Sequence, residues 1–220
     1  MKNEIPVTEK LKLTRATHRA SYDRDVIYSI IDEQLVCQIG IVRNGHAVIL
    51  PMAYGRQGDK IYLHGSSESP FIKEIIHSEI ICINIVILDG IVFARSSYAH
   101  GMNFRSVTIY GKPEELAAPD DKIKGLKIIM DRLLKNRWEN ARKPSEKELS
   151  HTSVFSVSLE EASAKIRSGP PKDFKSDLDR DIWAGVLPLK LTASSPVADE
   201  QCRTEPDEFI LNYRREDYNG

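Results

Sequence analysis

The fold is best predicted from one stretch, Tyr98-Ala-His-Gly-Met-Asn-Phe-Arg-Ser-Val-Thr-Ile-Tyr-Gly111. It begins like a polar loop and continues with the two-residue alternation of a β-strand. The alternation predicts that Val107 and Ile109, together with Phe104, face one side of the strand and that Ser106 faces the other. A strand that follows a polar loop so directly is a rigid platform for a binding site.

Polar side chains gather at the start of this strand: His100, Asn103, Arg105 and Ser106. An arginine, an amide and a hydroxyl suit an anionic or heteroaromatic ligand, because such groups are costly to bury without a partner. Taken singly, each is more often an ordinary loop hydrogen-bonder. From the residues alone, the ligand site and the ordinary loop are equally good interpretations.

A second polar cluster is His64-Gly65-Ser66-Ser67, which leads to Pro70 and Lys73. Backbone amides at a helix start, hydroxyls and a lysine one turn later would suit a phosphate group. The simpler interpretation is a serine-rich turn with a helix cap and a solvated lysine. The residues alone favour the simpler one.

A third cluster combines Lys165 and Arg167 with Gly169-Pro-Pro171 and, further on, Trp183. Two cations spaced two apart share one face of a strand, and with an indole they could hold an anion beside a flat ring. A surface strand and a core tryptophan explain the same residues, and this interpretation is favoured when the cluster is considered alone.

Composition describes an ordinary globular protein of 220 residues, with 41% hydrophobic and 29% charged residues. Because 31 basic residues face 32 acidic ones, no overall field would attract nucleic acid or anionic lipid. No uninterrupted apolar run approaches the ~20 residues of a membrane span. Cys37, Cys82 and Cys202 lack disulfide or metal-site spacing. We therefore expect a cytoplasmic protein without a metal site, bound to neither membrane nor nucleic acid.

Turn signals favour an antiparallel sheet. Asn44-Gly45 predicts a type I′ hairpin between strands at 35–43 and 46–54, and Asp89-Gly90 predicts a turn between apolar strands at 80–88 and 91–96. Two such hairpins argue against a parallel doubly wound sheet. We expect a mainly β (α+β) antiparallel barrel of six or more strands, with peripheral helices. The predicted helices are 24–34, 70–76, 120–137 and a short one after Ser145.

No repeat or linker forces a division into separate folding units. We predict an N-terminal arm at 1–22, one barrel domain at 23–191 and a polar C-terminal tail at 192–220.

Four segments occur together and in a characteristic order over roughly residues 12–191. They are Ile61-Tyr-Leu-His-Gly-Ser66, the stretch from Ser96 to Gly111, Ala164-Lys-Ile-Arg-Ser-Gly-Pro-Pro171 and Asp181-Ile-Trp-Ala-Gly-Val-Leu-Pro188. This set resembles the FMN-binding split-barrel family, in particular the flavin-nucleotide-binding proteins related to pyridoxamine 5'-phosphate oxidase, near the nitroimidazole-resistance branch.

The resemblance implies a six-stranded antiparallel split barrel that works as a homodimer, with FMN in two clefts at the subunit interface. The phosphate would be held by the end of the strand that begins near Ile61 and by the turn that follows it. The strand that contains Arg105 would face the ribityl chain or the ring edge of the flavin. The expected cofactor-binding residues are His64, Gly65, Ser66, Lys73, Asn103, Arg105, Ser106, Arg167 and Trp183.

The implied function is an FMN-dependent oxidoreductase that passes electrons from a nicotinamide donor, NADH or NADPH, to a small-molecule substrate. His100 is the candidate catalytic proton donor, and Arg105 the candidate for stabilising reduced flavin. The arginine-rich substrate pocket of a true pyridoxamine 5'-phosphate oxidase is not found, so that exact activity is disfavoured. The alternatives are a non-catalytic flavin carrier or sensor, and a barrel that binds haem or no cofactor.

Overall fold

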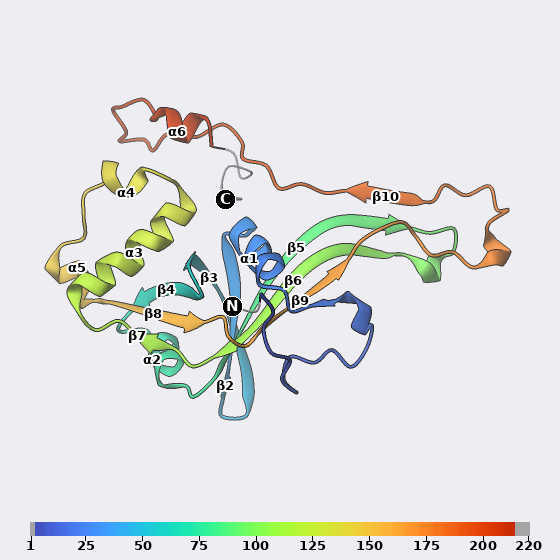
Figure 1. Cartoon of the computed structure of the whole chain (residues 1–220). Helices are drawn as coiled ribbons and strands as arrows, with labels where there is room; N and C mark the ends of the chain where they lie inside the picture. The colour runs from blue at the N-terminus through green and yellow to red at the C-terminus, as the bar shows by residue number, and fades with distance from the viewer. Residues whose placement is uncertain (1–2, 214–220) are drawn as a thin grey trace.

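A mainly antiparallel sheet forms the body of the protein, and one ribbon of that sheet projects from the body as an arm (Figure 1). The computed structural model describes residues 3–213. The strands are β1 (Ala20–Ser21), β2 (Val36–Arg43), β3 (His46–Gln57), β4 (Lys60–Ser66), β5 (Ile81–Phe93), β6 (Gly101–Gly111), β7 (Glu114–Glu115), β8 (Thr152–Ser158), β9 (Ala162–Arg167) and β10 (Gly185–Pro188).

The strands follow the order β1-β9-β6-β5-β2-β3-β4-β8-β7, and β10 pairs with β5. The expected class, a mainly antiparallel split barrel with peripheral helices, is confirmed, although the sheet does not close. Ten strands are present in the described residues, because short strands such as β1, β7 and β10 extend the barrel at its margins. The helices are η1 (Thr17–Arg19), α1 (Arg24–Glu33), α2 (Pro70–His77), η2 (Ser97–Ala99), α3 (Pro119–Leu133), α4 (Arg137–Asn140), α5 (Glu146–Ser150), η3 (Lys175–Asp177) and α6 (Glu208–Leu211).

Local signals in the sequence account for several of these boundaries. Asn44 and Gly45 have φ of 51° and 79°, as a type I′ hairpin requires. Asp23 caps α1 by accepting a hydrogen bond at 3.0 Å from the Val26 amide. The predicted helix at 120–137 was too long, because α3 ends at Leu133.

Strand β5 corrects one prediction of the sequence analysis. No turn occurs at Asp89-Gly90; instead β5 runs on to Phe93 with a β-bulge at this point. Leu88 pairs with Phe104 and Gly90 with Asn103, so Asp89 has no partner in the ladder. The bulge reverses the alternation: odd-numbered residues are buried before it and even-numbered ones after it. An added residue in a strand produces this reversal.

Strand β6 corrects a second prediction. Asn103, and not Phe104, shares the buried face with Val107 and Ile109. Phe104 is half-buried on the opposite face, with Ser106. This face of β6 is therefore polar near the start of the strand, in Asn103 and Arg105, and apolar further along.

The N-terminal segment packs on the barrel, because Ile5 and Leu11 lie within the hydrophobic core. The core also contains the apolar face of α1 and the inward residues of β2, β4 and β5. No helix within residues 3–213 is both long and apolar enough to cross a membrane.

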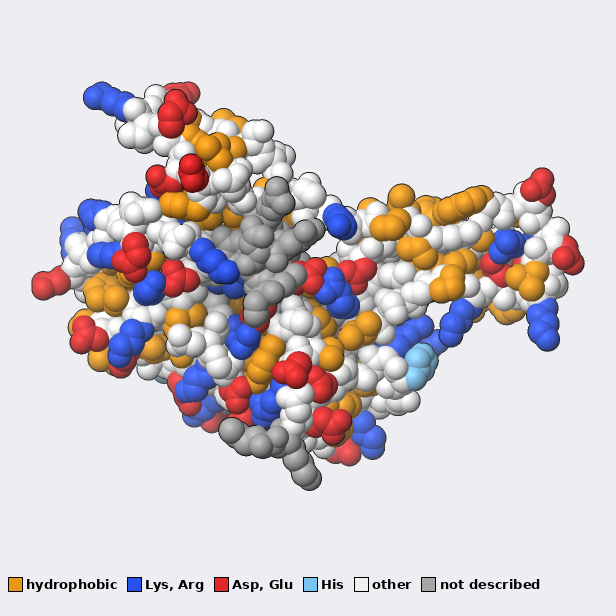
Figure 2. All heavy atoms as spheres, turned by 45° about the horizontal axis from the view of Figure 1, so that its top comes forward, with side chains coloured by type: hydrophobic (Ala, Val, Ile, Leu, Met, Phe, Trp, Pro, Cys, Tyr) orange, Lys and Arg blue, Asp and Glu red, His pale blue; other side chains and the backbone are white. Residues whose placement is uncertain are grey.

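The arm consists of the outer halves of β5 and β6 with β10 along the free edge of β5 (Figure 1). From β10 the chain returns across the molecule towards α3 and α4, and α6 is the last helix in the described residues (Figure 1). Hydrophobic side chains collect along the arm (Figure 2). Exposed fractions there are 43% for Leu88, 55% for Met102 and 69% for Trp183. An exposed apolar patch of this kind commonly marks an interaction surface.

Candidate functional site

The first group of predicted site residues lies where β4 passes into α2. His64, Gly65 and Ser66 end the strand, and Lys73 projects from the first turns of the helix. A Cβ on Gly65 would lie 2.5 Å from Cδ1 of Ile72. Glycine at this position therefore lets α2 pack directly against the turn.

The amides of this turn are already occupied. Ser67 N donates to the His151 carbonyl at 3.0 Å and Ser69 N to the Ser66 carbonyl at 3.1 Å. Glu68 N donates to Oγ of Ser66 at 3.2 Å. These three amides are used within the protein, which leaves an incoming phosphate to side chains and to the amides of the first turn of α2, where no side-chain cap is formed.

Three side chains remain to meet an anion at the turn. The Ser66 hydroxyl keeps its own proton for donation. Lys73 is exposed, and its ammonium makes no hydrogen bond within residues 3–213. His64 reaches the surface, yet the surrounding protein desolvates its ring and lowers its pKa, because burial disfavours the charged imidazole. Within this set, Lys73 carries the positive charge with which a phosphate would pair.

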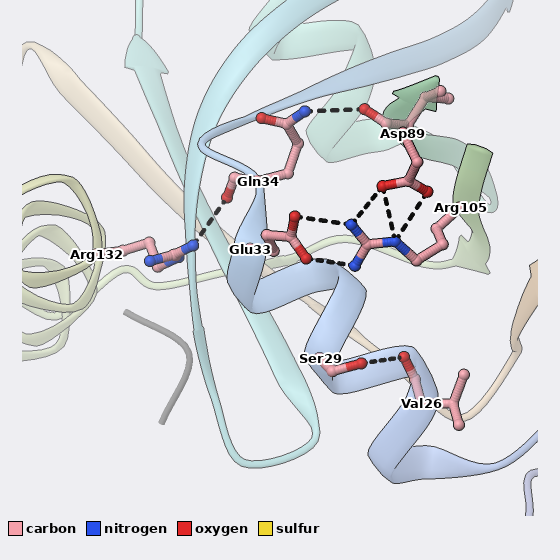
Figure 3. Close-up of polar contacts among 8 residues, drawn as sticks. Val26, Ser29, Glu33, Gln34, Asp89, Arg105 and Arg132 are labelled. Atoms are coloured by element: carbon pink, nitrogen blue, oxygen red, sulfur yellow. Dashed lines mark hydrogen bonds and ion pairs between the residues drawn. The ribbon is translucent and has the colours of Figure 1, made fainter. Parts of the chain in front are cut away.

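Arg105 belongs to a second group, shown in Figure 3. Its Nη2 lies 2.8 Å from Oε1 of Glu33 and 2.7 Å from Oδ1 of Asp89, and its Nε lies 3.0 Å from Oδ2 of Asp89. The side-chain hydrogen bonds of Glu33, followed by those of Asp89, raise the pKa of Arg105. Two carboxylates thus surround one guanidinium, and the cluster has a formal charge of −1.

The cluster lies beside a cavity of about 900 Å³. This cavity opens along the edge of β5 between the stretch that pairs with β2 and the stretch that pairs with β10. Gln34 closes part of that edge by donating to the Val86 carbonyl at 2.9 Å (Figure 3). The volume is within the range of cofactor and ligand pockets, about 300–1,000 Å³. Its lining includes Glu33, Gln34, Leu88, Asp89, Arg105 and Lys190.

Asn103 and Arg167 form a third group at the junction of β6 and β9. Arg167 Nη1 donates to Oδ1 of Asn103 at 3.0 Å, and Asn103 Nδ2 donates to the Gly169 carbonyl at 3.1 Å. The Ser106 hydroxyl donates to the Lys165 carbonyl at 3.3 Å. These side chains bind one another and fasten β9 and the Gly-Pro-Pro segment to β6.

His100 and Trp183 meet in a fourth group at the tip of the arm. Phe93 lies between them, with ring centroids 5.7 Å from His100, edge to face, and 5.9 Å from Trp183. Nδ1 of His100 lies 2.9 Å from the Ser96 carbonyl. The rings border a cavity of about 460 Å³.

Within one subunit these groups do not form one cleft. In the sheet order β5, β2 and β3 separate β6 from β4, so the predicted phosphate turn and the predicted flavin edge lie on different parts of the barrel. The structure joins Asn103 to Arg167 and places Phe93 between His100 and Trp183. Each pair combines residues from two different sequence clusters.

Sequence reasoning missed Glu33, Asp89 and Phe93. Glu33 ends α1 and Asp89 occupies the bulge, so both resembled ordinary helix-end and turn residues. Glu33 and Asp89 share one signal in the sequence. Each is an acid beside an apolar run, where burial of an unpaired carboxylate would be costly. Within residues 3–213, no three His, Cys, Asp or Glu side chains are grouped as metal ligands.

Comparison with known proteins agrees with this architecture. A family model described as pyridoxamine 5'-phosphate oxidase matches residues 23–166. The flavocytochrome Anf3 of Azotobacter vinelandii is 34% identical, with a TM-score of 0.88 over 94% of this chain and 97% of that one. The FAD and haem binding protein of Mycobacterium smegmatis is 29% identical, with a TM-score of 0.83 over 87% and 95% of the two chains.

A more distant structure, a candidate 5-nitroimidazole antibiotic resistance protein of Bacteroides thetaiotaomicron, shares the fold. It is 24% identical, with a TM-score of 0.57 over 67% of this chain and 86% of that one. No curated protein matches the chain. The matched segment spans the barrel, from the cap of α1 to the last strand of the body. On these grounds the chain belongs to the pyridoxamine 5'-phosphate oxidase-like family.

Proposed function

We propose that this protein is a flavin-dependent oxidoreductase that acts as a homodimer, taking electrons from NADH or NADPH and passing them to a small-molecule acceptor. One observation carries the proposal: 94% of this chain is similar in structure to a flavocytochrome, at 34% sequence identity. The bound flavin would supply the redox chemistry, while the protein binds it, orients it and sets its electrostatic surroundings.

The residues of the β4–α2 turn fit a flavin nucleotide. Ser66 and His64 at the end of β4 and Lys73 on α2 are exposed and offer a hydroxyl, an imidazole and an ammonium, groups with which a phosphate can pair. We propose FMN as the nucleotide, as the sequence predicts. FAD is the competing cofactor, because a relative is described as binding it.

The arm supports the proposal of a homodimer. Leu88 and Met102 point away from the barrel interior and remain exposed in the single subunit. A second copy is the partner that would cover this face on both subunits at once, since twofold interfaces are self-complementary. The same step would bring the phosphate turn of one subunit towards residues of the other, which a single chain keeps apart. The cytoplasm is the proposed compartment.

The absorbance spectrum of the purified protein, with and without added FMN or FAD, tests the proposal. We expect a flavin spectrum, bleaching by NADH or NADPH without oxygen, and reoxidation by an added acceptor. A flavin that binds but is not reduced would favour the carrier or sensor. A colourless protein that takes up neither nucleotide would refute flavin binding.

A second candidate is a protein that holds haem as well as flavin. Two observations favour it: two relatives that match over most of both chains are described as a flavocytochrome and as an FAD and haem binding protein, and the arm tip holds a cavity bordered by aromatic rings and a histidine. A Soret band in protein produced with a haem precursor, together with the flavin spectrum, is the expected result. Flavin without a Soret band after incubation with hemin would leave only the first candidate.

A further inference from the structure

The large cavity beside Arg105 has one wall that does not belong to the barrel. Between β10 and α6 the chain crosses the molecule as residues 189–206, here called the strap (Figure 1). Most of the other lining residues come from the end of α1 and from β5. A ligand in the cavity would therefore lie between the barrel and this strap. The strap lines the cavity with Leu189, Lys190, Leu191, Thr192 and Ala193.

Two anchors hold the strap at its ends, and they differ in strength. At the start, Leu189 N donates to the Asp89 carbonyl at 3.0 Å, one step beyond the last pair of β10 with β5. At the end, Asp207 precedes α6, and its Oδ2 lies 4.0 Å from Nη1 of Arg137 on α4. These two charged side chains are 48% and 44% exposed, and exposed ion pairs are weak. The second anchor is therefore the one that breaks easily.

Between its anchors the strap is attached to nothing in the barrel. Within the described chain, residues 191–206 make no hydrogen bond or ion pair with the body; those they form are internal, such as Cys202 N to the Asp199 carbonyl at 2.9 Å. Every side chain from 191 to 205 is exposed. A segment with so few contacts belongs to the part of a protein that opens most readily.

A ligand would give the strap the contacts that it lacks. Leu191 is 70% exposed although it lines the cavity, and it would be buried against a flat apolar body placed there. Arg105, the residue expected to face the flavin, lines the same cavity as the strap. A flavin ring beside Arg105 would thus be within reach of the strap.

We propose that the strap is a lid of the large cavity, which closes over the ring of the flavin. It turns about the hydrogen bond between Leu189 and Asp89, and it is released when Arg137 and Asp207 separate. This inference rests on the proposed function for the identity of the ligand, whereas the hinge and the second anchor belong to the chain itself.

Distances between two spin labels test the lid in the full-length protein. Cys202 is exposed on the strap, and Val42→Cys adds a second label on β2, where the native side chain is 78% exposed. Cys82→Ala removes the half-buried thiol, while Cys37 is buried and out of reach. Dilution with unlabelled protein leaves the distances within one subunit. We expect two distance populations, open and closed, and a shift towards the closed one when FMN is added.

Asp207→Asn tests the second anchor, because it removes the charge and keeps a side chain that suits the position before a helix. It should raise the ratio of open to closed strap about two- to fivefold, and high salt should act in the same direction on the wild type. Glu79→Gln is the matched control. It breaks an exposed pair with Lys112, at 2.9 Å, that involves no residue of the strap, and it should leave the ratio unchanged.

Two results would overturn the lid. One is a single broad distance population that does not respond to Asp207→Asn, as a merely loose segment would give. The other is flavin binding, seen in the absorbance spectrum, without a shift towards the closed population. If no flavin bound at all, the proposed function would fall, and the response of the ligand-free protein to Asp207→Asn would still decide whether the strap opens and closes.

Discussion

Arg105 illustrates how its neighbours limit what a single side chain can do. Glu33 and Asp89 bind its guanidinium from two sides, so little net positive charge is left for a ligand. The pairing joins the end of α1 to the base of the arm. We therefore regard Arg105 first as a residue that fixes the geometry beside the large cavity, and only second as a direct contact of flavin.

Arg105→Ala should lower the free energy of unfolding by about 1–3 kcal/mol, since two partly buried carboxylates would lose their partner. Urea unfolding at pH 7 measures this. Arg43→Ala is the control, because its pair with Glu74 is more exposed, and it should cost less than about 1 kcal/mol. Equal losses in the two variants would show that the cluster contributes no special stability.

The lowered pKa of His64 predicts that the free energy of unfolding depends on pH. Its pKa is lowered by burial, so below the ordinary histidine pKa of about 6.5 the unfolded chain binds a proton that the folded chain does not. Stability contributed by this group is therefore lost as the pH falls through that value. Unfolding at pH 7.5 and pH 5.5 should show a smaller acid loss in His64→Gln than in the wild type. His46→Gln, on the exposed β2–β3 hairpin, should follow the wild type.

The sequence predicted which polar residues gather at the mouth of β6 but not what they contact. Arg105 meets Glu33 across 72 positions of chain, a contact that no local pattern encodes. His100 and Trp183 were proposed for separate roles, and only the pairing of β10 with β5 brings them to the same aromatic group. The kinds of side chain at the site could therefore be predicted from the sequence. Their contact partners could not, because those depend on the tertiary fold.

At the scale of elements, helix caps and the Asn-Gly hairpin were predictable because their determinants lie within a few residues. The prediction of a turn at Asp89-Gly90 failed for a physical reason. Asp-Gly is typical of turns, but the same pair also accommodates a bulge, and the change of alternation beyond it resembled the start of a new strand. Only the neighbouring strands decide between the two.

Gly90→Ala tests how β10 is held. A new Cβ would lie 2.8 Å from the Leu187 carbonyl, so β10 should detach and the amides of residues 185–187 should exchange faster with solvent. Hydrogen exchange followed by mass spectrometry measures this. In Gly40→Ala the nearest atom would be at an ordinary 3.6 Å, and exchange there should not change. Unaltered protection of β10 in Gly90→Ala would contradict the close approach.

At the scale of the whole molecule, the family and barrel class were predictable from four short segments taken together, since their order reflects the topology. The arm was not. Its projection from the body depends on how far β5 and β6 continue beyond β2, and the sequence showed only apolar strands. The unusually apolar character of 80–88 was the one sign of a surface to be covered.

Leu88→Asp should separate the proposed dimer. A charge placed in an apolar interface without a partner is strongly unfavourable, so we expect a monomer by light scattering and weakened flavin binding. Val197→Asp, in the exposed tail, should remain dimeric and retain flavin. A monomeric wild type, or a Leu88→Asp dimer that keeps its flavin, would count against a cofactor site shared between subunits.

The extra residue in β5 adds a side chain without changing how the rest of the arm faces. If Asp89 were deleted, Leu88 and Gly90 would still pair with the consecutive residues Phe104 and Asn103, so the ladder would become continuous while Gly90 and Val92 kept their buried side. Phe93 would keep its place at the arm tip, whereas Arg105 would lose one of its two carboxylate partners. A gene shorter by one codon would therefore loosen the base of the arm and leave its outer end oriented as before.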